Sequence, residues 1–514
     1  MRTVLDRQKD AWIVVGLLAL MLISRIPFRS QMLYHWDSVN FAYAMREFDV
    51  AKEQPQTPGY IVYVWLCRFV NIVVNDAQTT MVIISIAASA LAVLALFRLG
   101  RSMFDRRVGL IAALFLAASP LFWFYGEVAL PHTLDTLLVI VNVWWLYEVM
   151  QGNHRYLYPA VLALAVTGGV RQQTMVFLAP LLLFALRRVG WKRFLIAGAI
   201  GAVICLAWFV PLMVLSGGLS NYMRIMSAYT YRFQSTTSVF LGGGWWGVRR
   251  NVLKLTMYTL YGWSVTMVPA IIYVASRVWR YAWLQCWEKP IFLMLWVVPS
   301  LAYYSLIHMG QQGLIFVFLP ALLLLSAVGL VRLLTIRPPW LVPVTAAILA
   351  AVNVFIFCLA PEYPLGDERL RLLTRATIVN SDHYYQDRIG AIESGFAPDS
   401  TAILAKNWHH VEYYLPEYMR LPFGVGGKWE KDTGSPRGNF QELVATPVEL
   451  GLRLDGRGQA AIVVFDPELM AFNESPASVH DLLLKHGAIL EYFVLDGEQH
   501  FHYGAQSFGP RERE

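Results

Sequence analysis

Charged residues are scarce in this chain: Asp, Glu, Lys and Arg make up only 15% of its 514 residues, and 57% are hydrophobic. Soluble globular domains average about 25% charged and roughly 45–50% apolar residues. The shortage of charge excludes an ordinary soluble globule, because so much apolar surface needs lipid around it. The formal net charge of +7 comes from short Lys and Arg clusters between hydrophobic runs, so it indicates membrane orientation and not nucleic-acid binding.

Cysteine and recognisable catalytic motifs are scarce as well. The four cysteines lie in or beside hydrophobic stretches, and none falls in the C-terminal part: Cys67, Cys205, Cys286 and Cys358. This excludes a disulfide framework and a structural zinc site. The chain has no P-loop, nucleophile elbow, zinc helix motif or dinucleotide fingerprint, and Gly242-Gly243-Gly244 lacks the strand and helix that such motifs need. ATP hydrolysis and redox chemistry are therefore unsupported.

Long apolar runs are abundant before Pro361. Most are roughly 18 to 24 residues long, enough to cross about 30 Å of hydrocarbon as a helix. About eleven spans are expected, near residues 12–28, 77–97, 108–124, 130–149, 157–170, 174–187, 194–216, 253–276, 291–307, 314–333 and 340–360. We predict a polytopic α-helical membrane domain over residues 1–360 and a small soluble α/β domain over residues 361–514.

The basic clusters set the expected topology. The first ten residues are basic and no cleavage signal follows, so the first apolar run is expected to stay as a span. Basic clusters then alternate with the spans and fall on one side: Arg2, Arg7, Lys9, Arg98, Arg101, Arg106, Arg107, Arg187, Arg188, Lys192, Arg193, Arg277, Arg280, Arg332 and Arg337. That side is predicted to be cytoplasmic. Gly59–Val74 would invert this pattern as a span, so we interpret it as an amphipathic helix at the outer interface.

The C-terminal part has the patterns of a compact α/β domain. Strands are expected at Thr401–Ala405, Tyr418–Leu421, Ala460–Phe465 and Ile489–Leu495, and helices at Asp382–Glu393, Asn407–Leu415 and Ser478–His486. An odd number of spans places this domain outside the cytoplasm. Aromatic residues from Trp408 to Tyr414 could contact an acceptor, although such spacing is more often part of a core.

Polar residues gather on the outer side of the predicted spans, where charges near hydrocarbon usually mark a site. Asp37, after His35 and Trp36, follows the first span and could also cap the next helix. The other candidates lie in outer turns or loops: Glu127, His132, Arg171, Gln172, Gln173, Arg232, Arg249, Arg250, His308, Gln311 and Gln312. Each also has a structural alternative, such as a solvated turn carboxylate, a snorkelling arginine or a structural histidine.

The carboxylates among these residues could act as a base, and the cations beside them could hold a phosphate. This combination is consistent with an enzyme that uses a lipid-linked phosphate donor, whose leaving group stays in the bilayer. Three features resemble the GT-C glycosyltransferases: the first-loop acid Asp37, the amphipathic helix Val39–Phe48 that follows it, and the run Gln54-Pro55-Gln56-Thr57-Pro58-Gly59-Tyr60. The similarity is greatest to their protein O-mannosyltransferase and aminoarabinose transferase branch. Further matches are Asn75-Asp76-Ala77-Gln78, the run 119–123, and Gln311-Gln312-Gly313 leading to 319–322.

The resemblance implies an inverting transfer of a sugar from a polyprenyl phosphate to an acceptor hydroxyl on the outer face. Asp37 would be the general base, and Arg171 with Arg249 or Arg250 would stabilise the departing phosphate. The expected substrate pocket contains His35, Tyr60, Glu127, His132, Gln172, His308 and Gln312. No cofactor is expected and metal dependence is disfavoured, because Ser38 stands where the family often has a second acid, although Asp37 and Glu127 could offer oxygen ligands.

The resemblance also implies a bacterial cytoplasmic-membrane protein, with its N-terminus in the cytoplasm and its C-terminal domain in the periplasm or outside. The partners would be membrane lipid, the polyprenyl-phosphate sugar and an acceptor that is a protein, a lipid or a glycan. Three alternatives remain at this point: a flippase for a lipid-linked sugar, a glycan ligase with a lipid-pyrophosphate donor, and a noncatalytic sensor.

Overall fold

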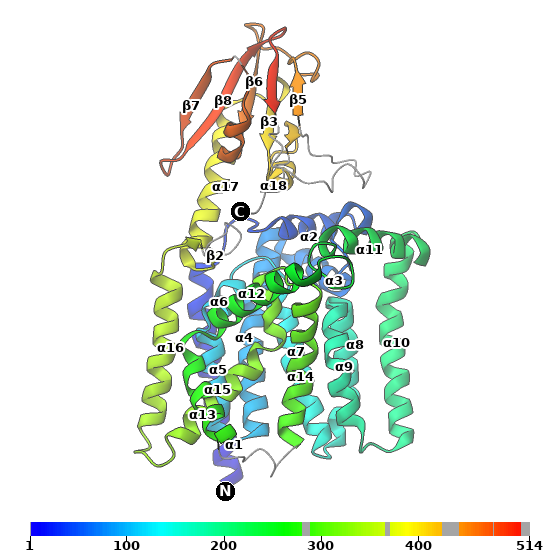
Figure 1. Cartoon of the computed structure of the whole chain (residues 1–514), viewed down its shortest axis with the longest axis vertical. Coiled ribbons are helices and arrows are strands. Elements are labelled where there is room, and N and C mark those ends of the chain that lie inside the picture. The colour runs from blue at the N-terminus through cyan, green and yellow to red at the C-terminus, as the bar shows by residue number, and fades with distance from the viewer. Residues whose placement is uncertain (1, 280–287, 365–370, 424–441, 476, 505–514) are drawn as a thin grey trace. The chain divides into compact units, whose positions relative to one another are not determined.

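The computed structural model describes residues 2–279, 288–364, 371–423, 442–475 and 477–504 (Figure 1). Arg280, which belongs to a predicted cytoplasmic basic cluster, and Cys286 lie outside the described residues. The chain forms two compact units: residues 1–31 with 41–379, and residues 32–40 with 380–514. Helix α2 (Trp36–Arg46) begins in the second unit and ends in the first. The second unit thus contains a short piece of the N-terminal region.

The first unit is a helical bundle (Figure 1). Its helices in the first half are α1 (Arg2–Arg25), α3 (Ile61–Val74), α4 (Ala77–Met103), α5 (Arg106–Ala118), α6 (Pro120–Tyr125), α7 (His132–Met150), α8 (Leu157–Val170) and α9 (Gln172–Leu186). The second half has α10 (Trp191–Leu215), α11 (Leu219–Gln234), α12 (Gly244–Trp263), α13 (Met267–Trp279), α14 (Glu288–Leu306), α15 (Leu319–Leu333) and α16 (Leu341–Leu359). Two short strands follow, β1 (Tyr363–Pro364) and β2 (Arg371–Leu372).

Seven helical stretches of the described chain are long and apolar enough to cross a membrane. They are Gln8–Phe28, Ala77–Met103, His132–Met150, Trp191–Leu215, Gly244–Ser276, Glu288–Leu306 and Leu341–Leu359. The predicted multi-pass helical architecture is therefore confirmed. Each of the eleven predicted ranges contains helix, while several of these helices are short, so the number of spans stays a prediction.

Local sequence signals explain where several helices begin and break. The Asp76 carboxylate accepts a hydrogen bond from the Thr79 N–H at 2.7 Å and caps α4, and Asp105 caps α5 through the Val108 N–H at 2.9 Å. The predicted span at 108–124 is divided into α5 and α6 at Ser119, because Pro120 lacks the N–H that would continue α5.

Helix α3, the predicted interfacial helix, has two different faces. Ile61, Val64 and Cys67 are buried, whereas the side chains of Phe69 and Val73 are 72% and 88% exposed. This amphipathic burial suits a helix whose outer face meets lipid or the interface. Its orientation in a bilayer stays a prediction.

The second unit is built on a five-stranded sheet with the strand order β4-β3-β6-β8-β7. Its strands are β3 (Thr401–Ala405), β4 (Met419–Pro422), β6 (Gln459–Val464), β7 (Val479–Leu483) and β8 (Ile489–Asp496). Strand β3 is parallel to β4 and β6, whereas β8 is antiparallel to β6 and β7. A separate antiparallel pair is formed by β5 (Glu442–Ala445) and β9 (Phe501–Gly504).

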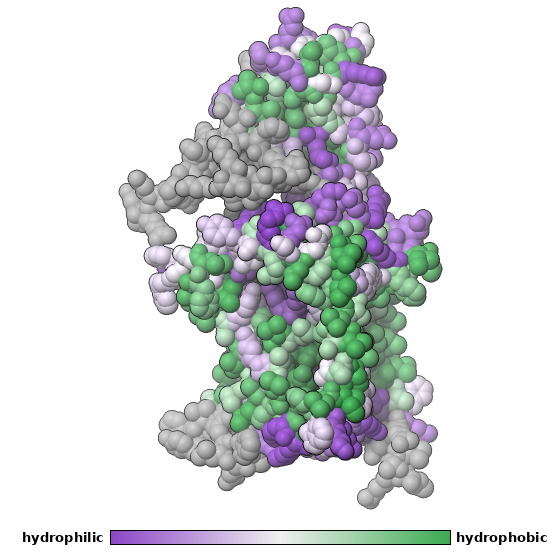
Figure 2. Space-filling view, turned by 90° about the vertical axis from the view of Figure 1, so that its right-hand side faces the viewer, coloured by the Kyte–Doolittle hydropathy of each residue, from purple (hydrophilic) through white to green (hydrophobic). Residues whose placement is uncertain are grey.

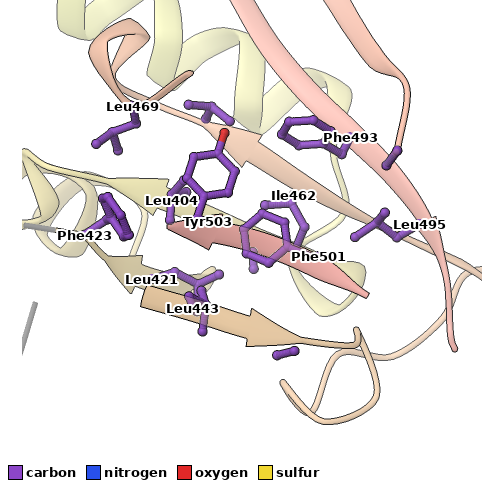
Figure 3. Packing of buried hydrophobic residues seen from close by; sticks show 14 of the residues in the cluster. Leu404, Leu421, Phe423, Leu443, Ile462, Leu469, Phe493, Leu495, Phe501 and Tyr503 are labelled. Carbon is purple, nitrogen blue, oxygen red and sulfur yellow. The ribbon is translucent and has the colours of Figure 1, made fainter. Parts of the chain in front are cut away.

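Alternate residues of the central strands enter two hydrophobic cores. Ala402 and Leu404 of β3 pack with Phe501 and Tyr503 of β9, as Figure 3 shows for Leu404, Phe501 and Tyr503. Ile403 and Ala405 pack instead against residues of α17 (Arg375–Gly395) and α18 (Trp408–Tyr414). This two-residue period is the side-chain alternation of a strand that is buried on both faces. It confirms the predicted small α/β domain.

The predicted helix at Ser478–His486 is wrong, because this range contains strand β7. Leu482 pairs with Leu490 of β8, and the Leu484 N–H donates to the Ala488 carbonyl at 2.8 Å across the hairpin turn. Gly487 has φ +83°, a left-handed conformation that the tight turn needs and that glycine adopts at little cost. Pairing with β8 overrides the helix preference of Leu-Leu-Leu-Lys.

Candidate functional site

A buried arginine lies at the junction of α8 and α9. Arg171 has extended backbone between the two helices and is only 8% exposed. Its Nη1 lies 3.4 Å from Asp135 Oδ2 of α7, and the Thr174 hydroxyl donates to the same oxygen at 3.0 Å. Within the described chain, Arg171 Nε and Asp135 Oδ1 are buried and have no hydrogen-bond partner. The pair therefore keeps hydrogen-bonding capacity for a further group.

The loop Gln54–Tyr60 lies against this junction. Tyr222 of α11 donates from its hydroxyl to the Pro58 carbonyl at 3.1 Å, and Gln172 Nε2 is 3.3 Å from the same hydroxyl. Tyr60 precedes α3 with φ +43°, and the phenols of Tyr60 and Tyr304 are close enough to Arg171 to interact electrostatically with its charge. The structure thus brings together three predicted site residues, Arg171, Gln172 and Tyr60.

More buried polar atoms of this region lack a partner within the described residues. They are Gln56 Oε1 and Thr57 Oγ1 of the loop, and the hydroxyl of Tyr304 on α14. Because an unpaired buried polar group costs free energy, such atoms in an apolar bundle usually meet a ligand, an ion or water. Their concentration around Arg171 marks this region as the best candidate site of the first unit.

A hydrogen-bonded chain leads from this junction to His308. Gln173 Nε2 donates to the Tyr303 hydroxyl at 3.2 Å, and Tyr303 also bonds Gln234 at the end of α11. Thr237 Oγ1, three residues further, lies 3.0 Å from His308 Nδ1. Burial, together with the charges of Arg250 and Lys254, lowers the pKa of His308 to about 4. His308 is therefore a neutral imidazole at physiological pH.

The two predicted arginines of α12 differ. Arg249 is exposed and its guanidinium lies 5.3 Å from the centre of the Trp246 ring, whereas Arg250 is half-buried and interacts electrostatically with Tyr258 and His308. Of the two, only Arg250 is connected through described contacts to the polar groups around His308.

His132 and Gln312 lie at the contact between α7 and the short helix Gln312–Val317. His132 Nε2 is 2.8 Å from Gln311 Oε1, and Gln312 Nε2 donates to the Arg371 carbonyl at 2.7 Å. A Cβ on Gly313 would lie 2.6 Å from the His132 ring, so glycine is required there for the close approach. These contacts join the turn after α14 to the start of α7.

Glu127 lies in a separate buried cluster. Trp123 Nε1 donates to Glu127 Oε1 at 2.6 Å, and the Arg25 guanidinium of α1 lies 4.1 Å above the Trp123 ring. Burial raises the pKa of Glu127, against the opposing positive charges of Arg25 and Arg375. Phe357 of α16 stacks on Trp123 with a centroid distance of 4.9 Å. This cluster joins α1, α6 and α16.

Asp37 and His35 belong to the second unit. Asp37 is in the first turn of α2, its N–H donates to His35 Nδ1 at 3.1 Å, and its Oδ2 lies 3.5 Å from the same nitrogen. Burial lowers the pKa of His35 to about 4, so Nδ1 is an acceptor at neutral pH and the contact with the carboxylate is not an ion pair. Asp37 thus lies beside a neutral imidazole.

Sequence reasoning missed two buried charged residues, Asp135 and Arg25. Both stand within apolar runs that were predicted as spans, and an ionisable residue at such a position is a site candidate in its own right. That signal could have identified Asp135 and Arg25 as site candidates, but not the residues with which they interact. In the described part of the chain, no group of three or more His, Cys, Asp or Glu side chains is placed to hold a metal ion.

Comparisons with known proteins agree with the fold. The sequence profile of the family described as dolichyl-phosphate-mannose-protein mannosyltransferase matches residues 55–215, a range that includes Tyr60, Asp135 and Arg171. No curated protein sequence matches the chain.

Solved structures resemble the chain over nearly its whole length. ArnT from Cupriavidus metallidurans in the apo state has a TM-score of 0.60 at 12% identity, covering 95% of this chain and 98% of that one. The same protein bound to undecaprenyl phosphate has a TM-score of 0.58 at 12% identity, covering 94% and 97%. The oligosaccharyltransferase AglB from Archaeoglobus fulgidus, in complex with an inhibitory peptide and a dolichol-phosphate, has a TM-score of 0.52 at 10% identity, covering 99% and 75%.

These likenesses establish that the chain has the fold of the GT-C membrane glycosyltransferases. The profile match and the structural matches together confirm the predicted resemblance to the protein O-mannosyltransferase and ArnT branch.

Proposed function

We propose that this chain is an inverting glycosyltransferase that moves a sugar from a polyprenyl-phosphate donor to an acceptor hydroxyl at the outer face of a membrane. The observation that carries the proposal is Arg171, a buried guanidinium with an unpartnered Nε among the described groups around it. ArnT, which has the same fold, has been solved with undecaprenyl phosphate. A fixed cation in a largely apolar bundle suits the phosphate of such a lipid.

In the proposed reaction, Asp37 removes the proton of the acceptor hydroxyl as its oxygen attacks the anomeric carbon. The bond between that carbon and the phosphate oxygen breaks, and the electron pair leaves with the polyprenyl phosphate. Attack from the face opposite the leaving group inverts the anomeric configuration. Arg171 stabilises the charge that develops on the leaving phosphate, while the polyprenyl chain stays in lipid.

Asp135 prepares Arg171 for this role. The carboxylate bonds Nη1 and fixes the guanidinium, leaving Nε for the donor. Arg250 would add positive charge near His308. Tyr60 and Gln172, which lie beside Arg171, would line the donor pocket. The other predicted substrate-pocket residues are His35, Glu127, His132, His308 and Gln312, and the proposal includes no cofactor. The sugar is a hexose or a pentose in this proposal, and its acceptor is a protein, a lipid or a glycan.

The test measures the release of polyprenyl phosphate from a panel of polyprenyl-phosphate sugars, using purified protein and a cell-envelope extract as acceptor. We expect wild type to release it and Asp37→Asn to be inactive. Arg171→Lys keeps a positive charge beside Asp135 but loses the planar guanidinium that can bond a phosphate through two N–H groups. We therefore expect kcat/KM to fall roughly 10²- to 10³-fold. Arg188→Lys, an exposed site at the opposite end of α9, is the matched control and should behave as wild type. The same assay in the presence of EDTA tests metal dependence: a loss of polyprenyl phosphate release would show that a metal is needed.

Other outcomes separate the rival functions. Full turnover by Asp37→Asn would remove that residue as the base. Release of a lipid pyrophosphate from a glycan donor would identify a ligase. Transport of an intact donor across liposomes, without release, would identify a flippase.

A further inference from the structure

The segment that carries Asp37 folds with the C-terminal part of the chain. Residues 32–40 belong to the same compact unit as residues 380–514, about 350 residues further along. Met32 is 9% exposed and packs in one core with Ile389, Ile403 and Val411. A residue placed between the first predicted span and α2 is thus an integral part of the α/β domain core.

Three side chains of the C-terminal part bond the backbone of residues 32 and 33. The Met32 N–H donates to Asp382 Oδ1 at 2.9 Å, and the Leu33 N–H donates to the Tyr414 hydroxyl at 3.0 Å. His410 Nε2 lies 2.8 Å from the Leu33 carbonyl, to which its N–H donates. Both N–H groups of this dipeptide and the Leu33 carbonyl therefore have partners, so the backbone four residues before Asp37 has little freedom to move.

Two of these three side chains are buried, and aromatic rings pack beside them. Asp382 and His410 are 7% and 2% exposed. The His410 ring stacks on Tyr385 of α17 with a centroid distance of 4.0 Å and an interplanar angle of 12°. His409 lies against Trp36, the residue before Asp37, at 5.6 Å and stacks on Trp408 at 3.7 Å. The contacts therefore continue from the bonded dipeptide to the first residue of α2.

We infer that the C-terminal domain is the positioning scaffold of the predicted base, and that Asp382, His410 and Tyr414 set the place of Asp37 through the backbone of Met32 and Leu33. The inference rests on the proposed function, in which Asp37 acts on the acceptor. It gives the domain a part in the chemical step that is separate from acceptor recognition. A base misplaced by about 1 Å can lose about 10²-fold in rate.

Tyr414→Phe and His410→Phe in the full-length protein test the inference, because each removes one bond to Leu33 while keeping an aromatic ring. We expect kcat to fall roughly 10- to 100-fold with the donor KM unchanged. Tyr418→Phe is the matched control: its hydroxyl donates to the Phe396 carbonyl at 2.9 Å and to the Ile392 carbonyl at 3.3 Å, both in the C-terminal part of the same unit. It should keep the wild-type kcat.

Asp382 allows a rescue. Asp382→Ala removes the acceptor of the Met32 N–H, whereas Asp382→Asn keeps an oxygen in its place and should restore most of the lost kcat. Hydrogen exchange supplies a readout that needs no substrate: the Leu33 amide should exchange roughly tenfold faster in Tyr414→Phe than in wild type or Tyr418→Phe, with β3 and β6 unchanged.

The outcomes distinguish this inference from the proposed function. If wild type releases polyprenyl phosphate and Asp37→Asn does not, the proposed function holds. A wild-type kcat in both Tyr414→Phe and His410→Phe would then overturn the positioning role alone. Equal losses in Tyr418→Phe, or a change in donor KM without a change in kcat, would overturn it as well, since they report general destabilisation or donor binding. If wild type is inactive on every donor, the proposed function fails first.

Discussion

His410 links a single proton to the stability of the C-terminal unit. It is buried against Tyr385, Leu33 and His35, and burial lowers its pKa to about 3 from an ordinary value near 6.5. The folded state therefore holds a neutral imidazole at pH values where the unfolded chain binds a proton. Stability from this group is complete above pH 6.5 and is lost as the pH falls from 6.5 towards 3, at up to about 1.4 kcal/mol per pH unit.

We predict that protection of α18 from hydrogen exchange, corrected for intrinsic rates, decreases in wild type between pH 7 and pH 5. His410→Phe should start lower, because it loses the bond to Leu33, but should lose less on acidification. The measurement is exchange of α18 peptides of the full-length protein at several pH values. Parallel losses in both proteins would show that His410 is not the titrating group.

At the level of single residues, the sequence can show that a charged residue is a site candidate, but it does not show which residue it pairs with. Arg171, next to two glutamines in an apolar hairpin, was identifiable because a cation beside hydrocarbon is expensive. Its partner Asp135 lies 36 residues away on another helix, and only packing of α7 against α9 shows that the two pair. No spacing rule reveals such a contact.

At the scale of elements, two glycines allow α4 and α5 to pack closely. A Cβ on Gly109 would lie 2.5 Å from the Phe97 carbonyl oxygen and 2.8 Å from the Arg101 backbone nitrogen. A Cβ on Gly100 would lie 2.7 Å from the Gly109 Cα. The obstacle in each case is helix backbone, which cannot move aside as a side chain can, so small residues are needed here.

Gly109→Ala should therefore separate α4 from α5 and destabilise the bundle by about 1–3 kcal/mol. Thermal unfolding of the detergent-solubilised protein measures the effect. Gly198→Ala in α10 is the control, because nothing lies within 4 Å of its added Cβ and alanine favours the helix. A melting temperature of Gly109→Ala equal to that of Gly198→Ala would contradict the packing argument.

Elements were predictable where a local pattern decides them. The four expected strands of the tail were found because short apolar runs and the turn signals that bound them are local. Strand β7 was missed because it is an edge strand whose residues are mostly exposed, so its identity comes from pairing with β8. The association of Met32 with the C-terminal core could not be predicted from sequence patterns either, because it joins segments about 350 residues apart.

At the scale of the whole molecule, several basic clusters gather at one end of the bundle. Asp10 of α1 pairs with Arg101 and Arg106, which joins the N-terminal end of α1 to the turn between α4 and α5. Lys289 of α14 donates to the Met103 carbonyl at 2.7 Å, and Glu288 pairs with Arg187 and Arg188 after α9. Figure 2 shows hydrophilic residues gathered at this end, below a largely hydrophobic flank.

The same contacts place Arg171 and the basic clusters at opposite ends of α9, because this helix runs from Gln172 to Leu186. By the positive-inside rule, we predict that the basic end faces the cytoplasm. The candidate phosphate site would then face outward, which is where the proposed reaction needs it. The orientation can be tested apart from any enzymatic activity.

We predict that, in a variant with all four native cysteines replaced, Asp399→Cys is labelled by a membrane-impermeant maleimide in intact spheroplasts, and Arg188→Cys only after permeabilisation. Both positions suit the test, since their side chains are 74% and 63% exposed. Labelling of 188 with protection of 399 would invert the topology and place Arg171 on the cytoplasmic side. Labelling of both in intact spheroplasts would require an even number of crossings between them, and the five spans predicted between residues 188 and 399 would then be wrong.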